Sequence, residues 1–379
     1  VGDLAQGGEA VVMEFLQNLI SLPGDEMVNL VTFPGLGLEF TLNRVAIVVL
    51  GRPIYWYGII ITFGLILAVV LCSKWAPRFG VNADQIIDLM LFAVPAALVA
   101  IRAYYVIFNL SIFQNEDGSL NWGRILNYGD GGLAIYGAII SSAIVLLIFS
   151  RVRKVSFLAF ADLGVHGMFI GQLIGRWGNF MNVEAFGSAT TLPWRMCSDS
   201  IARYMYTNGY VDQGGYEAIL EGTLGVHPTF FYESAWNFVG LILVYLTGRK
   251  RKFDGQCFLF YVFWYGVGRA WIEGLRTDSL YFFGLELFGV PIRTSQLLAA
   301  VSALAAGAVL LWLMRRGGSP DKLYVNRLAA ERAASEKIQT AGEADSGAAD
   351  AGEGAGQEET PAGQPEEKPR DKGDTEERG

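Results

Sequence analysis

The segment Gly175–Glu184, with the sequence GRWGNFMNVE, carries side chains that could bind a phosphate group. The guanidinium of Arg176 presents a planar fork of donors that matches phosphate oxygens. Asn179 and Asn182 add amides, Glu184 adds a carboxylate, and the glycines permit close approach of a ligand to the backbone. The same residues would also suit an ordinary helix end at a membrane interface, where a long arginine reaches toward water. Residue chemistry alone leaves both interpretations open.

Two further groups of residues have the same ambiguity. Arg269 and Glu273 are spaced i,i+4, which places them on one helix face, and Arg276 follows about one turn later. They could serve a ligand or form a self-neutralising structural pair. The segment His227–Glu233, HPTFFYE, has a proline followed by a carboxylate, a combination that is also typical of a helix start.

Seven long apolar segments must position these side chains. They lie near residues 57–75, 86–110, 131–150, 157–176, 228–247, 256–276 and 294–314. Each approaches the roughly 20 residues that a helix needs to cross a bilayer. Clusters of Lys and Arg follow only the first, third, fifth and seventh segments, and such clusters mark the cytoplasmic side. We therefore predict an all-α polytopic membrane protein with seven transmembrane helices, the N-terminus outside and the C-terminus inside.

This topology places the ionisable and hydroxyl groups of the spans at one depth. A charge at the centre of a membrane helix costs about 2.5–3.5 kcal/mol on insertion scales, so charges that persist there are candidates for function. The groups expected in the outward half are Tyr57, Arg102, Tyr136, Arg176, Glu233, Arg269, Glu273 and Arg276. Their convergence predicts a site for an anionic ligand that resides in the membrane.

The segments outside the spans differ in composition. Residues 1–52 include the alternating stretch 38–47, which favours a strand or an interfacial arm on the outer surface. Residues 53–316 form the predicted membrane domain, in which the long connection 184–227 suits a small extracytoplasmic head. We expect 317–379 to be a cytoplasmic acidic tail.

The net charge of −8 arises in that tail, because residues 341–379 hold 12 acidic and 4 basic residues. The same stretch has no Leu, Ile, Val or aromatic residue, which predicts disorder. The three cysteines do not suggest a disulfide framework. The sequence has no recognisable metal motif and no glycine-rich loop after a strand. We therefore expect no metal, no cofactor and no nucleic-acid partner.

Five sequence blocks, taken in their order along the chain, resemble the prolipoprotein diacylglyceryl transferase family. The stretch GRWGNFMNVEAFG is similar to that family's motif GRxGNFxNxExxG. The other blocks are PIYWYG at 53–58, GGLAIYG at 131–137, HPTFFYE at 227–233 and GRAWIEGLR at 268–276. A single short motif would be weak, whereas an ordered set on a seven-span frame is specific.

The resemblance implies a seven-helix membrane body with an N-terminal arm and an extracytoplasmic head, in the bacterial plasma membrane. It implies transfer of the diacylglyceryl group of phosphatidylglycerol to the lipobox cysteine in the signal peptide of a prolipoprotein. Glycerol 1-phosphate leaves, no metal or cofactor takes part, and the active site faces the outer leaflet.

The resemblance also assigns roles to residues. Arg176 and Arg269 would bind the phosphate and stabilise the leaving group, with Glu184 and Glu273 orienting them. The other positions expected to bind substrate are Tyr57, Arg102, Asn179, Asn182, Gly187 and Arg276.

One position departs from the family pattern. Tyr136 stands where many members have histidine, and neutral tyrosine, with a pKa of about 10, is a better donor than base near neutral pH. We expect Tyr136 to position substrate. The alternative class is a secondary transporter or lipid flippase, which predicts charges along a path through both leaflets and broken helices near the midplane.

Overall fold

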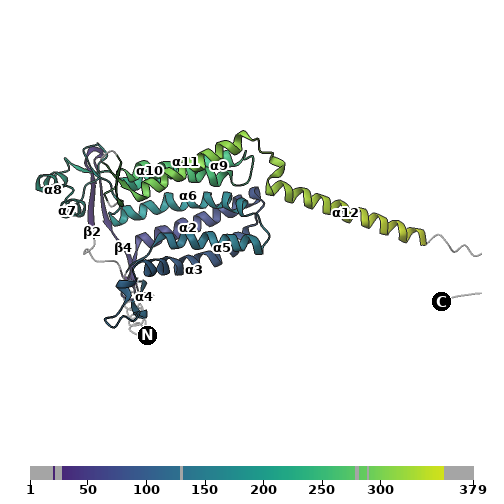
Figure 1. Cartoon of the computed structure of the whole chain (residues 1–379), viewed down its shortest axis with the longest axis horizontal. Coiled ribbons are helices and arrows are strands. Elements are labelled where there is room, and N and C mark those ends of the chain that lie inside the picture. Colours follow the sequence, from purple (N-terminus) through teal and green to yellow (C-terminus); the bar gives the residue numbers. More distant parts are fainter. Residues whose placement is uncertain (1–19, 22–27, 129–130, 278–280, 288–289, 354–379) are drawn as a thin grey trace, which may run out of the picture. The chain divides into compact units, whose positions relative to one another are not determined.

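The computed structural model describes residues 20–21, 28–128, 131–277, 281–287 and 290–353. The chain divides at Arg327 into two units. The first unit contains seven long helices that run side by side (Figure 1). They are α2 (Trp56–Trp75), α3 (Ala83–Phe108), α5 (Ile135–Val152), α6 (Phe157–Asn182), α9 (Thr229–Gly248), α10 (Gln256–Glu273) and α11 (Thr294–Arg315).

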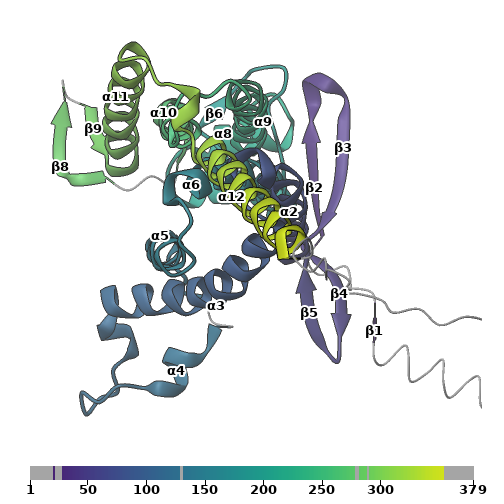
Figure 2. The same cartoon turned by 90° about the vertical axis from the view of Figure 1, so that its right-hand side faces the viewer.

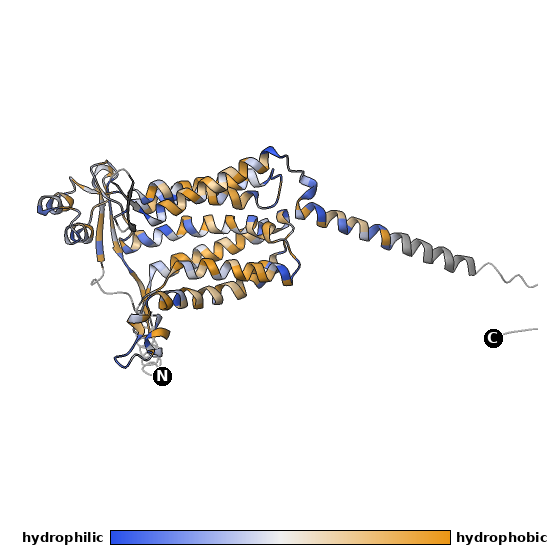
Figure 3. Cartoon of the chain, viewed as in Figure 1, coloured by the Kyte–Doolittle hydropathy of each residue, from blue (hydrophilic) through white to orange (hydrophobic). Residues whose placement is uncertain are grey.

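Six of these helices are long and apolar enough to cross a membrane, which fits a polytopic membrane protein. The exception among the seven is α10, which has the required length of 18 residues but a more polar composition. It contains Gln256, Arg269 and Glu273 along with several aromatic residues, so the charges that suggest function also lower its mean hydropathy. Figure 3 shows mainly hydrophobic residues along the helices and hydrophilic residues mostly toward their ends.

The bundle is organised around α6. In Figure 2, which looks along the helices, α9, α10 and α11 lie on one side of α6 and α3 and α5 on the other. Half of the most apolar part of α6 is buried inside the protein, compared with 17% for α2, α5 and α11. Helices α3 and α5 approach closely at Gly137, where an added Cβ would lie 2.1 Å from the carbonyl oxygen of Ala100. A helix at the centre of the bundle can present side chains from its end to several neighbours at once.

The description all-α holds for the bundle but not for the segments at its end, where short strands form. The alternating stretch predicted as a strand or arm is confirmed, because β2 (Val28–Phe33) pairs antiparallel with β3 (Leu38–Asn43). Strand β4 (Val45–Val49) pairs with β1 (Ile20–Ser21) and β5 (Arg52–Tyr55). A further hairpin that the sequence analysis missed, β8 (Tyr281–Leu287) with β9 (Val290–Arg293), precedes α11.

The connection between α6 and α9, called the head below, includes short helices and strands. It contains β6 (Ala189–Thr190), α7 (Asp199–Thr207), α8 (Gln213–Leu220) and β7 (Gly225–Val226). The head joins the arm through paired backbone hydrogen bonds of 2.9 Å between Thr32 and Cys197. Val31 of the arm, Phe180 of α6 and Ile201 of the head belong to one buried apolar cluster. The arm and the head therefore form one layer, visible at the end of the bundle in Figure 1.

The acidic tail differs in part from the prediction of disorder. Helix α12 (Tyr324–Glu353) continues through residues 341–353, and the remainder of the tail, 354–379, lies outside the described residues. In 341–353, five of the thirteen residues are Ala, which has the highest helix propensity. The prediction considered only the absence of a core, and a helix can form without one when its residues favour it.

The three cysteines are unpaired and buried. Burial raises the pKa of the Cys197 thiol in the head to about 11 from its usual 9.0. Because the thiolate is the disfavoured form, we expect Cys197 in the folded protein to resist maleimide between pH 7 and 10 and to react rapidly in denaturant. The sign also predicts a loss of stability as the pH rises from about 9 to 11, since the unfolded chain then releases the proton first. Mass spectrometry of the peptide that contains Cys197 would measure the rate of maleimide labelling. Equal rates with and without denaturant would contradict the expected protection.

Candidate active site

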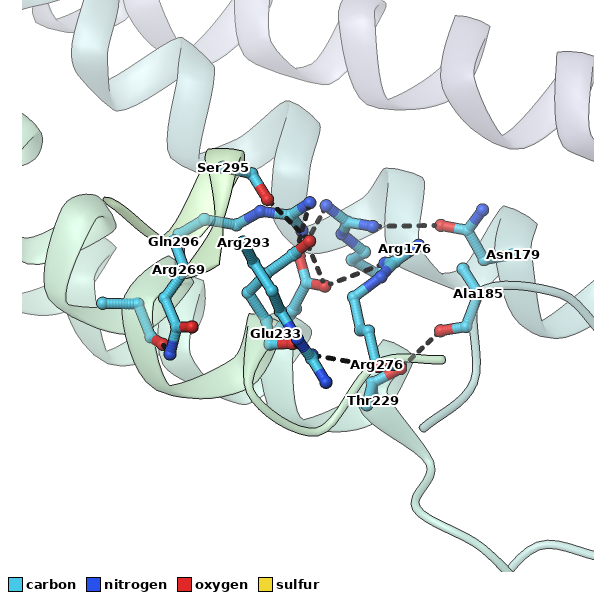
Figure 4. A network of polar contacts seen from close by, with 12 residues as sticks. Arg176, Asn179, Ala185, Thr229, Glu233, Arg269, Arg276, Arg293, Ser295 and Gln296 are labelled. Atoms are coloured by element: carbon cyan, nitrogen blue, oxygen red, sulfur yellow. Dashed lines mark hydrogen bonds and ion pairs between the residues drawn. The ribbon is translucent and has the colours of Figure 1, made fainter. Parts of the chain in front are cut away.

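An arginine cluster lies where the end of α6, the start of α9, the end of α10 and the start of α11 meet. It consists of the guanidinium groups of Arg176, Arg269 and Arg276 around the carboxylates of Glu233 and Glu273 (Figure 4). The members are far apart in the sequence, and each comes from the last or first turns of its element or from the loop after α10. The structure thereby brings together Arg176, Arg269, Glu273 and Arg276, as the common-depth argument predicted.

Glu233 is the centre of the arginine cluster. One carboxylate oxygen lies 2.5 Å from Nη2 of Arg176. The other lies 3.5 Å from Nη1 of Arg269 and 3.5 Å from Nη1 of Arg276. The side chain is only 5% exposed, so a single buried carboxylate orients three guanidinium groups.

Glu273 holds Arg269 from the other side. Its Oε2 lies 2.7 Å from Nη2 of Arg269, and its Oε1 accepts a hydrogen bond of 2.6 Å from the hydroxyl of Ser295. Arg293 donates to the backbone carbonyls of Glu273 and Arg276, the latter at 3.0 Å. Both carboxylate oxygens of Glu273 are thus engaged, and the start of α11 is fastened to the end of α10.

The exposed face of this cluster is cationic. The side chains of Arg176 and Arg269 are each 22% exposed, whereas those of Glu233 and Glu273 are 5% and 3% exposed. Buried ion pairs persist only when their geometry repays the cost of removing both charges from water. Here the carboxylates lie behind the guanidinium groups and hold them in place before any ligand arrives. Such preorganised donors can stabilise negative charge that develops in a transition state.

Asn179, Asn182 and Glu184 form a second layer beside Arg176. Nη1 of Arg176 lies 3.5 Å from Oδ1 of Asn179. The amides of Asn179 and Asn182 donate to Oε1 of Glu184 at 3.0 and 3.1 Å. Val183 ends α6 in the left-handed conformation at φ 51°, which turns Glu184 back onto the last helical turn.

Glu184 was expected to orient Arg176, and in the structure the carboxylate that contacts this arginine directly is that of Glu233. The αL turn directs Glu184 toward the two asparagine amides, so Glu184 orients Asn179, and only through Asn179 does it reach Arg176. Arg44 of the arm also joins this layer, with a 2.6 Å hydrogen bond from its guanidinium to the carbonyl of Asn182.

Gly187 and Tyr57 contact the site through packing. Gly187 donates its N–H to the carbonyl of His227 at 2.9 Å and pairs with Arg276 as an isolated bridge. This contact fastens the start of the head to the loop that carries Arg276. The ring of Tyr57, at the start of α2, lies where a Cβ on Gly178 of α6 would be 2.8 Å away. Each glycine is thus required by the close approach of a neighbour.

Replacing Gly187 with alanine is expected to destabilise the protein. The new Cβ would lie 2.7 Å from the Cβ of His227 and 3.0 Å from the carbonyl oxygen of Leu275. Overpacking of this kind costs about 1–3 kcal/mol. Thermal unfolding of the purified protein in detergent would show a lowered Tm. The matched control is Gly214→Ala in α8, where the nearest atom to the Cβ is 3.6 Å away, and an equal Tm in the two variants would contradict the expectation.

Arg102 does not belong to the arginine cluster. Its side chain is buried and donates to five backbone carbonyls, those of Arg124, Ile125, Asn127, Gly131 and Gly132. The described contacts of the Arg102 guanidinium are all with the protein backbone, so its expected role in binding substrate stays a prediction. Its role here is to hold the loop between α3 and α5, because a guanidinium with five donors can satisfy several carbonyls that no helix or strand pairs.

Tyr136 lies on the first turn of α5 and is about half exposed. Its ring centroid is 6.1 Å from that of Tyr104 on α3. Among the described contacts, none joins its hydroxyl to the arginine cluster.

Four residues of the network were missing from the predicted site: Glu233, Arg293, Ser295 and Gln296. Glu233 was placed at the common depth and at a helix start but not in the predicted site. The other three lie at or just before the start of the final apolar segment, and Gln296 donates to the carbonyl of Ala270 at 2.8 Å. The polar run at the start of that segment was an available signal. Among the described residues, no group of three or more His, Cys, Asp or Glu side chains could hold a metal ion.

Comparisons with known proteins point in the same direction. The family model described as prolipoprotein diacylglyceryl transferase matches residues 44–313. A phosphatidylglycerol–prolipoprotein diacylglyceryl transferase of Bacillus cytotoxicus is 37% identical over 295 residues, covering 77% of this chain and 99% of that protein. Proteins of the same name from Bacillus mycoides and Oceanobacillus iheyensis are each 38% identical, over 76% and 75% of this chain and 98% and 92% of their own lengths.

Proposed function

The chain belongs to the prolipoprotein diacylglyceryl transferase family, and from this premise we propose that it moves the diacylglyceryl group of phosphatidylglycerol onto a prolipoprotein cysteine. The protein is a membrane transferase of lipoprotein biosynthesis. The observation that carries the proposal is the pair of partly exposed guanidinium groups, Arg176 and Arg269, held by buried carboxylates at one end of the apolar helices.

In the proposed reaction, the sulfur of the lipobox cysteine attacks the carbon of the diacylglyceryl group that is bonded to the phosphate oxygen. The S–C bond forms, the C–O bond to phosphate breaks, and its electron pair leaves with glycerol 1-phosphate. The phosphodiester monoanion becomes a phosphomonoester dianion, so negative charge grows on the phosphate during the reaction. Arg176 and Arg269 then bind the transition state more strongly than the ground state, which is the requirement for catalysis.

The nucleophile needs its thiol proton removed. A free thiol has a pKa of about 8.5 and is only a few per cent ionised near neutral pH. We propose that the positive field of the arginine cluster favours the thiolate. Asn179, Asn182, Glu184, Tyr57 and Gly187 shape the adjoining lipid site, and Arg276 completes the cationic face.

We also propose a topology in which α10 crosses the membrane as a seventh span. The N-terminal arm 1–52 and the head 184–227 then lie outside, and the tail 317–379 lies in the cytoplasm. The membrane domain is 53–316. This arrangement follows the Lys and Arg that succeed every second span, and it turns the arginine cluster toward the outer leaflet of the plasma membrane.

The test is incubation of the purified full chain with a lipobox peptide and phosphatidylglycerol, followed by mass spectrometry of the peptide. The expected result is a diacylglyceryl mass gain on the cysteine, together with release of glycerol 1-phosphate. A peptide with serine in place of the cysteine is the control. No mass gain with folded protein would overturn the proposed function.

Replacing Tyr136 with phenylalanine is expected to lower kcat/KM about tenfold or more, because a hydrogen bond to a charged group contributes about 1.5–3 kcal/mol. The matched control is Tyr104→Phe, which removes a hydroxyl from the neighbouring ring on α3 and should leave the rate unchanged. Full activity of the Tyr136 variant in the peptide assay would exclude a role for its hydroxyl.

A further inference from the structure

A cavity of about 630 Å³ lies at the opposite end of the bundle from the arginine cluster. The helix α9 connects the two places, since Glu233 lies in its first turns and Tyr245 and Gly248 near its end. At 1.5 Å of rise per residue, the 12 to 15 residues from Glu233 to Tyr245 and Gly248 separate the two places by about 18 to 23 Å along the helix. The cavity therefore cannot be part of the transfer site.

The cavity is strongly basic. Five of its fourteen lining residues are Arg or Lys, and none of the fourteen is acidic. The five are Arg78, Arg249, Lys250, Arg251 and Lys252. Within the part of the chain that the structure describes, Arg251 alone of these lies within 4.0 Å of a carboxylate, at 3.9 Å from Asp254. The charge of the other four is not balanced by an ion pair there.

The loop that carries these cations is held in place by hydrogen bonds to other parts of the chain. Asp162 of α6 is fully buried and accepts hydrogen bonds from the backbone N–H groups of Gly255 and Phe258, at 2.8 and 2.9 Å. Arg251 is also buried and donates to the carbonyl of Arg78 at 2.8 Å, which ties the loop to the segment after α2. Asp254 accepts from the N–H of Tyr324 at 2.8 Å. Three attachments from different parts of the chain thus fix the backbone beneath the exposed lysines.

Aromatic rings form the remaining wall. Trp75 and Tyr245 have ring centroids 5.2 Å apart, and Arg78 and Arg249 lie over the ring of Tyr245 at 5.2 and 5.7 Å. Tryptophan and tyrosine are enriched at the level of lipid headgroups, and basic pockets between spans recognise anionic headgroups. The combination of cations, rings and a fixed loop is that of a headgroup site.

We propose that this cavity binds a phosphate-bearing anion, with Lys250, Lys252 and Arg249 as its donors. Under the topology proposed above, this end faces the cytoplasm, where both an inner-leaflet phospholipid and a free phosphate monoester are available. The site is independent of the transfer reaction. Loss of anion binding at this cavity and loss of peptide transfer can therefore be measured separately.

The experiment is native mass spectrometry of the full chain in detergent, titrated separately with dioleoyl phosphatidic acid, dioleoyl phosphatidylcholine and glycerol 1-phosphate. The test variant is Lys250→Gln/Lys252→Gln. Both lysines are exposed, so the substitutions should leave the fold intact. The matched control is Arg315→Gln/Arg316→Gln, which removes two cations from the end of α11 that do not line the cavity.

We expect phosphatidic acid to bind the lysine variant about 25-fold more weakly than the control variant, at about fivefold per lysine. Competition by glycerol 1-phosphate at similar concentrations would identify a free phosphate ester as the ligand, and retention against it would identify a lipid headgroup. Equal losses in the two variants, no change in either, or equal binding of phosphatidylcholine would overturn the proposal. Peptide transfer by the lysine variant should match the control.

Discussion

Replacing Arg176 or Arg269 with alanine is expected to reduce diacylglyceryl transfer by a factor of about 100–1,000. Each guanidinium is aimed at a position where negative charge would develop, and removal of one preorganised donor typically costs a factor of that size. Glu233 keeps two of its three arginines in either variant, and in Arg269→Ala the carboxylate of Glu273 keeps the hydrogen bond from Ser295. The loss should therefore appear in kcat, with a folded protein.

Substitution of either arginine by lysine tests the effect of the positive charge separately from that of the planar guanidinium. Lysine keeps the positive charge but lacks the planar fork that pairs with two oxygens at once. We expect Arg176→Lys and Arg269→Lys to recover part of the activity and to remain well below the wild type. The two alanine substitutions together should cost less than the product of the single effects, because both side chains share Glu233.

The measurement is the rate of peptide modification with phosphatidylglycerol in excess. Arg203→Ala in the head is the control, since Arg203 forms an exposed i,i+4 pair with Asp199 and should contribute little. Alanine variants that transfer at the wild-type rate would move the phosphate site elsewhere.

Replacing Glu233 with glutamine is expected to lower both stability and kcat. The amide keeps the size of the side chain but removes the negative charge that faces three guanidinium groups. Breaking a buried ion pair from one side costs about 3–5 kcal/mol, because the remaining charges stay buried without compensation. The arginines then lose their common orientation.

A split between KM and kcat distinguishes this orienting role from simple unfolding. Without Glu233 the guanidinium groups carry more uncompensated charge, so the KM for phosphatidylglycerol should stay equal or fall while kcat drops about a hundredfold. Glu217→Gln in α8, an exposed carboxylate bonded to Gln213, is the matched control. A raised KM with unchanged kcat would contradict the proposed role of Glu233.

The sequence predicted most of the fold through two patterns of apolar residues. Apolar runs of about 20 residues predicted the long helices, and alternation over 38–47 predicted the strands of the arm. The predicted segment 256–276 forms helix α10, although Arg269 and Glu273 lower its mean hydropathy. The hairpin β8–β9 and the helical part of the tail lacked a strong periodic signal of either kind.

The candidate site was predicted by depth, and one of its ion pairs was predicted by spacing. Arg176, Arg269, Glu273 and Arg276 lie together because their helices end at one level, which the sequence pattern already implied. The i,i+4 spacing predicted the pair of Arg269 with Glu273, whereas the contact of Glu233 with Arg176 was not predicted, because the two residues lie on different helices. The αL conformation of Val183 excluded Glu184, and the packing of α9 on α6 selected Glu233.

By itself, the sequence determined that this chain is a polytopic membrane protein with cations clustered after alternate spans and ordered motifs of one enzyme family. These properties depend on hydropathy and residue order, which are local. Only the tertiary structure showed that Glu233 contacts three arginines, that Arg102 binds the carbonyls of a loop, and that a basic cavity lies at the end of the bundle away from the arginine cluster. Such facts depend on rotation and contact between helices, and a residue's type does not specify the neighbour that another helix brings to it.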